Sequence, residues 1–163
     1  MAPITARARL RSALSKRLVP LLISSGFEGP SSIAGNAILH KYRRRSSDGT
    51  QVLTIQLEKY QRPRFVINLH VEPLEGIEKL ISHGGTLATG RLKAKPGPWT
   101  RSWFRADRPW WQRVIFRRRD TLEEQALDVC LSMLPEVEIW WGNRLPTAHI
   151  DSSQVTYPGV RDS

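Results

Sequence analysis

Apolar residues recur at helical spacing near the start of the chain, and arginines and a lysine occupy the opposite positions. This pattern predicts one amphipathic helix over residues 3–25, with Pro20 kinking it. Gly26 followed by Phe27 predicts a left-handed helix end in which Phe27 folds back on Leu22. The same segment is rich in Arg and Ser and has no acidic residue, which is also typical of a transit peptide. The Gly-Phe ending favours a helix docked on the domain. The apolar positions are Ile4, Leu10, Leu14, Leu18, Leu21 and Leu22.

Alternating apolar and polar positions predict three strands, over residues 37–43, 50–60 and 64–71. If Tyr60 pairs with Arg64, Leu57 lies opposite Ile67 and the apolar residues of both strands share one face. The three strands then form an antiparallel meander. We expect the N-terminal helix to cover its apolar face.

Weaker patterns follow in the second half of the chain. They predict a short helix over 73–82, a strand over 86–95, and a helix from Asp120 through Met133 that Pro135 ends. The predicted fold class is α+β, with an antiparallel β-meander of three to five strands packed on one face by N-terminal and C-terminal helices. Residues 1–145 are expected to form this single domain, and residues 146–163 an extended or disordered tail.

Four features, taken in order, resemble a bacterial family known as domain of unknown function 4304. The resemblance spans residues 5–141. The features are the helix ending in residues 18–27, the strand pair 52–57 and 65–71, the tryptophan-arginine segment ending at Trp110-Trp111, and the helix that runs into Leu134-Pro135. The cationic stretch 91–108 departs from the family pattern. The resemblance implies a small α+β fold and assigns no activity. That architecture is similar to many bacterial immunity proteins, which is an analogy of fold.

Charge is distributed unevenly along the 163 residues, whose formal net charge is +10. Residues 1–64 and 91–119 each carry a net +9, whereas residues 65–90 carry −2 and residues 120–163 carry −6. The acidic C-terminal block can neutralise part of the basic surface in a compact domain. Of the 25 basic residues 19 are Arg, which suits bidentate contacts with phosphate or carboxylate but also arises from genome composition.

Catalytic and metal-binding patterns are absent from the sequence. It contains no Gly-x-Ser-x-Gly elbow, phosphate loop, His-Glu-x-x-His pair or calcium loop. The single cysteine, Cys130, lies on the apolar face of the last predicted helix and is expected to be a buried structural thiol. The four histidines show no metal-ligand spacing. We therefore expect no catalytic site, cofactor or metal, and the short apolar stretches predict no transmembrane span. A cytoplasmic location is expected.

The sheet register predicts one polar constellation on the face opposite the core. Thr54 would neighbour His70, Gln56 would neighbour Asn68, and Lys41 would lie close by on the first strand. These side chains could form a recognition surface. The alternative is an ordinary solvated sheet face.

The segment from Trp99 to Arg119 interleaves aromatic and arginine side chains and is the strongest candidate for partner binding. Its arginines could neutralise phosphates while its rings stack on bases, or the segment could recognise a protein. Alternatively, the tryptophans pack in the core and the arginines pair with the acidic last helix. A membrane-surface role lacks a continuous apolar face. The candidate partner-binding residues are Arg101, Trp103, Arg105, Arg108, Trp110, Trp111, Arg113, Arg117, Arg118 and Arg119.

Together these observations favour a non-enzymatic protein-binding module. An immunity or inhibitor protein that neutralises an acidic toxin is one form of it, because a basic face would steer an acidic partner. The alternative is a nucleic-acid-binding protein that uses the Arg/Trp-rich segment 99–119. The sequence does not predict the oligomeric state.

Overall fold

The computed structural model describes residues 4–35, 37–95, 102–107 and 122–158. The helical elements are α1 (Ala6–Ala13), a π-helical turn η1 (Leu14–Leu18), α2 (Val19–Ser24), α3 (Ile77–His83), α5 (Leu122–Ser132) and α6 (Leu134–Asn143). The strands are β1 (Leu39–Ser46), β2 (Gly49–Leu57), β3 (Arg64–Glu72), β4 (Gly85–Leu92), β5 (Phe104–Arg105) and β6 (Ile150–Tyr157).

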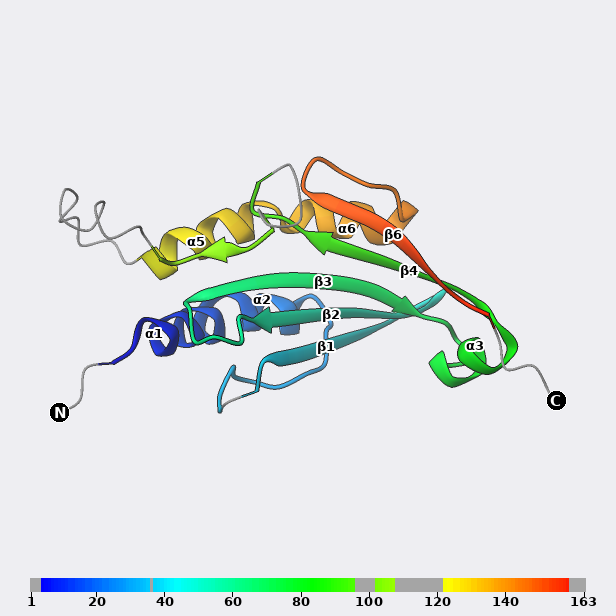
Figure 1. Ribbon diagram of the computed structural model, residues 1–163, viewed down its shortest axis with the longest axis horizontal. Coiled ribbons are helices and arrows are strands. Elements are labelled where there is room, and N and C mark those ends of the chain that lie inside the picture. The colour runs from blue at the N-terminus through cyan, green and yellow to red at the C-terminus, as the bar shows by residue number, and fades with distance from the viewer. Residues whose placement is uncertain (1–3, 36, 96–101, 108–121, 159–163) are drawn as a thin grey trace.

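The strands form one antiparallel sheet in the order β1-β2-β3-β4-β6, with the short β5 paired to β3. The helices α1, α2, α5 and α6 gather on one side of this sheet (Figure 1). The α+β prediction, with a meander covered on one face by N-terminal and C-terminal helices, is confirmed.

The N-terminal helix forms where the apolar pattern predicts it and ends as predicted. The amide of Phe27 donates to the carbonyl of Leu22, and the amide of Gly26, whose φ is 85°, donates to the carbonyl of Ile23. This pair of bonds is the Schellman ending. The chain accommodates Pro20 through the π-helical turn η1, in which the amide of Val19 bonds five residues back.

The predicted pairing of β2 with β3 is wrong by two residues. Leu57 lies opposite Phe65 and Ile55 lies opposite Ile67. The turn is longer than expected, because the Glu58 carboxylate accepts hydrogen bonds from the amides of Tyr60 and Arg62. A shift of two leaves every side chain on its face, so the apolar alternation cannot distinguish the two registers.

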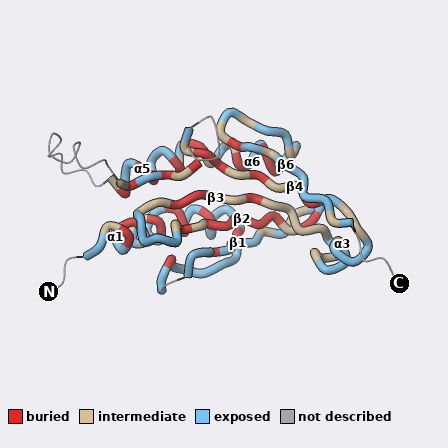
Figure 2. Tube along the Cα trace, viewed as in Figure 1, coloured by how far each residue is buried: buried red, intermediate tan, exposed pale blue. Residues whose placement is uncertain are grey.

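The core lies between the helices and the covered face of the sheet. One row of residues on this face crosses all five principal strands and passes through Ile67 on β3, Leu92 on β4 and Ile150 on β6. The residues of this row are fully buried from β2 to β6. The next row brings Gly90 against the ring of Trp140 from α6. Figure 2 shows the buried residues concentrated along the sheet centre and the inward sides of the helices.

Pro135 follows the end of one helix, as predicted, and also lies at the start of another. Helix α5 ends at Ser132, and Pro135 occupies the first turn of α6, which sequence analysis did not predict. A proline is tolerated there because the first-turn amides have no partner within the helix. Helix α6 contributes the buried residues Val137, Trp140 and Trp141.

The predicted tail after residue 145 is also wrong over most of its length. Residues 150–157 form β6, which pairs with β4 at every position from Ile150 opposite Leu92 to Tyr157 opposite Gly85. The domain therefore extends at least to Tyr157. A hydrogen bond between Nδ1 of His149 and Oε1 of Glu136, which are 2.6 Å apart, fixes the start of this strand to α6.

Candidate functional site

The side of the sheet opposite the helices carries the polar side chains that the sequence places together. One row crosses four strands through Lys41 on β1, Thr54 on β2, Asn68 on β3 and Arg91 on β4. Adjacent strands lie about 4.8 Å apart, so the backbones of Lys41 and Arg91 are separated by about 14 Å. We call this side the open face, because none of α1, α2, α5 and α6 packs on it.

A chain of hydrogen bonds links three of these side chains. Asn68 donates through Nδ2 to Oε1 of Gln56, at 2.9 Å, and accepts from Nε of Arg91 at 2.8 Å. Gln56 and Asn68 are therefore diagonal neighbours that bond directly. Thr54 faces Asn68 across the strands, and the predicted contact of Thr54 with His70 is replaced by that pair.

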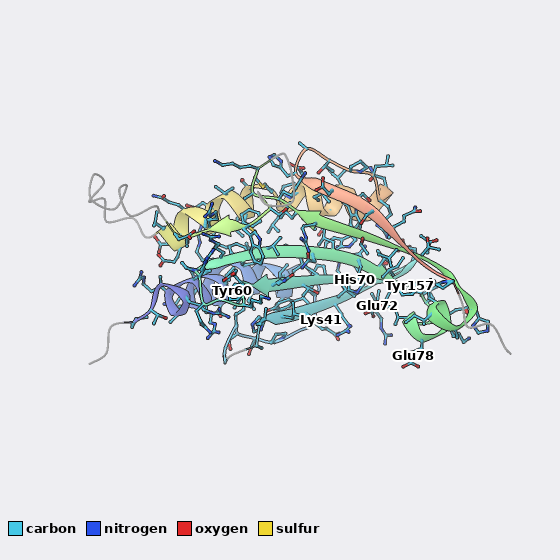
Figure 3. The ribbon with its side chains drawn as sticks, viewed as in Figure 1. Lys41, Tyr60, His70, Glu72, Glu78 and Tyr157 are labelled. Carbon is cyan, nitrogen blue, oxygen red and sulfur yellow. The ribbon has the colours of Figure 1, made fainter. Side chains whose placement is uncertain are left out.

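His70 lies on the next row of the open face, beside charged side chains of both signs. Its Nε2 is 3.4 Å from Oε1 of Glu72, which also lies 3.6 Å from a guanidinium nitrogen of Arg43. Burial lowers the pKa of His70; Glu72 opposes this change, while Lys41 and Arg43 add to it. Figure 3 shows Lys41, His70 and Glu72 on β1 and β3. The lowered pKa of His70 favours the neutral form of its ring.

Short side chains form the floor of the open face. Thr54 is 6% exposed and Val52 is fully buried, although α1, α2, α5 and α6 lie on the other side of the sheet. Longer polar side chains on the neighbouring strands surround them, and Lys41 and Arg43 are exposed. The face therefore has a buried centre, and exposed cations lie along β1 at its edge.

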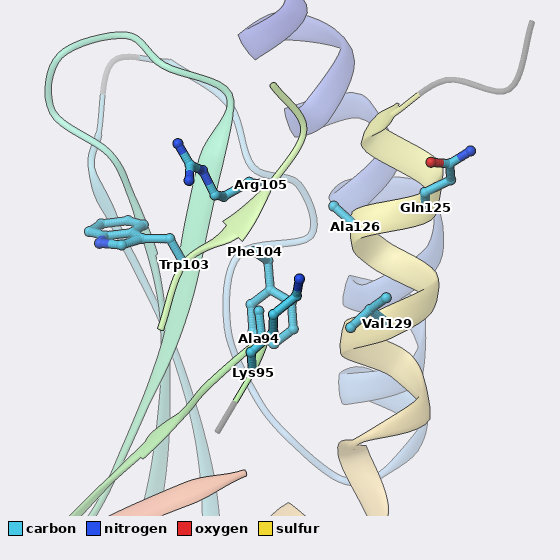
Figure 4. Close-up of a pocket in the computed structure, with 8 residues that line it drawn as sticks. All are labelled: Ala94, Lys95, Trp103, Phe104, Arg105, Gln125, Ala126 and Val129. Carbon is cyan, nitrogen blue, oxygen red and sulfur yellow. The ribbon is translucent and has the colours of Figure 1, made fainter. Parts of the chain in front are cut away.

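The described part of the Arg/Trp segment joins this same face. Phe104 pairs with Phe65 and stacks on its ring at a centroid distance of 4.9 Å, on the core side. Strand alternation then directs Trp103 and Arg105 to the open face. Figure 4 shows Trp103 directed away from α5, and Phe104 on the other side of the strand. Sequence analysis treated the sheet face and the segment as two candidates, and β5 brings them together.

Most of the segment lies outside the described residues. Of the ten candidate partner-binding residues, only Trp103 and Arg105 are described, and Arg105 lies 3.3 Å from Asp107. The others lie outside the described residues: Arg101, Arg108, Trp110, Trp111, Arg113, Arg117, Arg118 and Arg119.

The acidic residues of α5 pair with the N-terminal helix. Glu123, which is buried, accepts from Nε of Arg9 at 3.0 Å, and Asp128 accepts from Arg17 at 2.7 Å. Within the described chain, these two carboxylates therefore pair with two arginines of the first basic block and hold α5 against the N-terminal helix.

The arginine run at residues 43–45 divides between the two faces. Arg44 points to the covered side, where it donates to Gln51, Ser25 and Glu138 and lies over the rings of Phe27 and Trp141. Alternation directs Arg43 and Arg45 to the open face. Arg44 is therefore a structural residue that fastens β1 to α2 and α6.

A cavity of about 650 Å³ lies between β5 and α5. Its lining is mainly apolar. The residues that line it are Ala94, Lys95, Trp103, Phe104, Arg105, Gln125, Ala126 and Val129 (Figure 4). In the described ranges, no three His, Cys, Asp or Glu side chains group as metal ligands. None of the described helices is long and apolar enough to cross a membrane.

Comparisons with protein-family models, curated proteins and solved structures find no match. The resemblance to the domain of unknown function 4304 therefore stays a prediction.

Proposed function

We propose that this protein is a non-enzymatic binding protein, acting in the cytoplasm, whose open face recognises an acidic surface of a protein partner. A toxin or enzyme with such a surface would make it an immunity or inhibitor protein. The observation that carries the proposal is the row from Lys41 to Arg91 with its hydrogen-bonded centre. The single cysteine, which is free, fits a reducing compartment.

The cations of the open face are available to a partner. Among the described residues, Lys41 and Arg45 form no ion pair, and Arg91 bonds the amide of Asn68 rather than a carboxylate. Cations of this kind steer an acidic partner toward the face and repel basic ones.

The centre of the face supports specificity. Gln56, Asn68 and Arg91 hold one another in fixed positions, so their remaining donors and acceptors are oriented before a partner arrives. A partner that leaves these groups unpaired on burial would lose about 1–3 kcal/mol for each one. Such a penalty discriminates between partners of equal charge.

Trp103 supplies the type of side chain that dominates protein interfaces. Tryptophan and arginine are enriched among residues whose truncation costs most binding energy. Five strands of about eight residues form a face of about 20 Å by 25 Å, before side-chain relief is counted. This is on the order of the ~800 Å² that each partner contributes to a standard interface.

A charge-matched pair of variants tests the proposal. Lys41→Ala with Arg91→Ala removes the two cations at the ends of the row, whereas Lys16→Ala with Arg62→Ala removes the same charges from exposed sites elsewhere. Tagged proteins would be used to isolate partners from the native host, with mass spectrometry and stoichiometry as the readout. We expect the wild type and the Lys16/Arg62 variant to retain one stoichiometric acidic protein, and the Lys41/Arg91 variant to lose it. Equal retention by both variants, with unchanged circular dichroism, would refute the proposal.

Nucleic-acid binding is the second candidate, and the position of Trp103 beside Arg105 on a cationic face favours it. A ring on such a face can stack on an unpaired base while arginines contact phosphates. With six phosphate contacts, affinity for a single strand would fall about 300-fold between 50 and 200 mM salt, so retention above that range would depend on stacking. Retention on a single-stranded oligonucleotide column that persists above 300 mM salt, and is lost on Trp103→Ala, would support this candidate over the first.

A further inference from the structure

A group of basic side chains lies on the covered side of the sheet, where α1 meets the start of β1. Arg7 and Arg11 are one helical turn apart on α1, and His40 lies on the covered face of β1. Arg7 is 5% exposed, His40 is 6% exposed and Arg11 is half-buried. None of the three belongs to the open face.

Backbone contacts bring these side chains to one place. Nη1 of Arg7 donates to the carbonyl of Glu58 at 2.5 Å, and the neighbouring amide of Leu57 donates to the carbonyl of Ile38. Ile38 directly precedes β1, and His40 is the second residue of that strand. The N-terminal helix therefore crosses the sheet at the end of β2 and the beginning of β1.

Three nitrogen atoms of this group are buried without a hydrogen-bond partner: Nε of Arg7, Nε of Arg11 and Nε2 of His40. In the part of the chain that the structure describes, no carboxylate bonds either guanidinium group. The charge of Glu58 acts on Arg7, but Oε2 of Glu58 accepts hydrogen bonds from two backbone amides. Burial lowers the pKa of both Arg7 and His40, and the charge of Arg11 lowers both further.

We propose that Arg7 and Arg11, with His40 beside them, form a binding site for a small oxyanion of the phosphate type. Guanidinium groups present forked N–H donors that match the oxygens of phosphate, and a buried pair without a counter-charge is costly unless an anion is taken up. The site would join α1 to the sheet. It is independent of the partner proposed for the open face.

Thermal unfolding in sodium phosphate tests this site against sodium chloride of equal ionic strength. The variants are Arg11→Gln and, as the charge-matched control, Lys16→Gln, which alters an exposed residue a turn and a half along the same helical segment. A dissociation constant of about 10 mM would raise the Tm by roughly 3–6 °C at 100 mM phosphate. Calorimetric titration with phosphate would give the stoichiometry.

We expect wild type and Lys16→Gln to show a saturable phosphate shift with one bound anion. Arg11→Gln should lose that shift, and in chloride its Tm should equal or exceed that of the wild type, because the repulsion between Arg7 and Arg11 is gone. Exclusion of phosphate from the protein surface also stabilises proteins, but it is not saturable and would remain in Arg11→Gln. A linear shift of equal size in all three proteins, or no heat of binding, would overturn the proposal.

Discussion

Replacing Gly90 with alanine should test the packing that holds the covered face of the sheet against α6. Gly90 lies on β4, and a Cβ atom added there would be 2.8 Å from Cε2 of Trp140 and 3.2 Å from a methyl group of Ile150. Carbon atoms normally approach to 3.5–4.0 Å. The ring is fully buried and its Nε1 is held by Ser152 at 3.2 Å, so it has little freedom to move away.

Overpacking of this kind costs about 1–3 kcal/mol. For a domain of this size each kcal/mol corresponds to about 2–4 °C, so we expect Gly90→Ala to lower the Tm by roughly 2–12 °C. Gly142→Ala is the control, because Gly142 lies in α6 with no atom within 4 Å of an added Cβ. It should raise stability by up to about 1 kcal/mol through helix propensity.

Urea denaturation followed by tryptophan fluorescence would measure both free energies of unfolding. A Gly90→Ala variant as stable as the wild type would refute the packing of Trp140 against β4. The adjacent Arg91 points to the open face, so partner binding by a folded Gly90→Ala variant should be unchanged.

Two further predictions concern buried titratable groups. Burial raises the pKa of Tyr42 to about 12 and leaves its hydroxyl without a partner among the described residues. Because the unfolded chain ionises near pH 10, the stability from this group is complete below pH 10 and is lost as the pH rises toward 12. The difference in free energy of unfolding between Tyr42→Phe and the wild type, measured by urea titration, should therefore shift in favour of Tyr42→Phe between pH 8 and pH 11. An unchanged difference would contradict this. Cys130 is fully buried, and burial raises the pKa of its thiol, so a disulfide reagent at pH 8 should modify it only at the rate of unfolding. Immediate modification of the native protein would show that α5 does not bury it.

The elements found from the sequence are those whose signals are local. The alternation in β2 and β3, and the Gly26-Phe27 helix end, each depend on residues within one element or turn. The register between β2 and β3 depended instead on the turn after Leu57, where Gln61 adopts a positive φ of 64°. Alternation carries no information about a shift of two residues.

The elements that sequence analysis missed have weak local signals. Strand β6 contains five exposed residues between Asp151 and Thr156, and its place in the sheet comes from pairing with β4, some 60 residues earlier. Helix α6 was not predicted, because Pro135 can mark either the end of one helix or the start of the next.

The candidate site was predicted in part for the same reasons. The polar face was found because Lys41, Thr54, Gln56, Asn68 and His70 occupy the outward positions of adjacent strands. Arg91 on β4 and Trp103, which directly precedes β5, were not assigned to it, because β4 and β5 join β3 through long-range pairings that no local pattern encodes.

Site-specific photo-cross-linking in the native host would test the binding role of the open face most directly. A photoreactive residue would replace Ser153, which is exposed on the open face beside Thr89, or Lys16, which is exposed on the helical side. The account predicts one discrete protein adduct from position 153, none of that mass from position 16, and loss of the adduct when Lys41→Ala and Arg91→Ala are added. No adduct at position 153, or the same adduct from both positions, would contradict it.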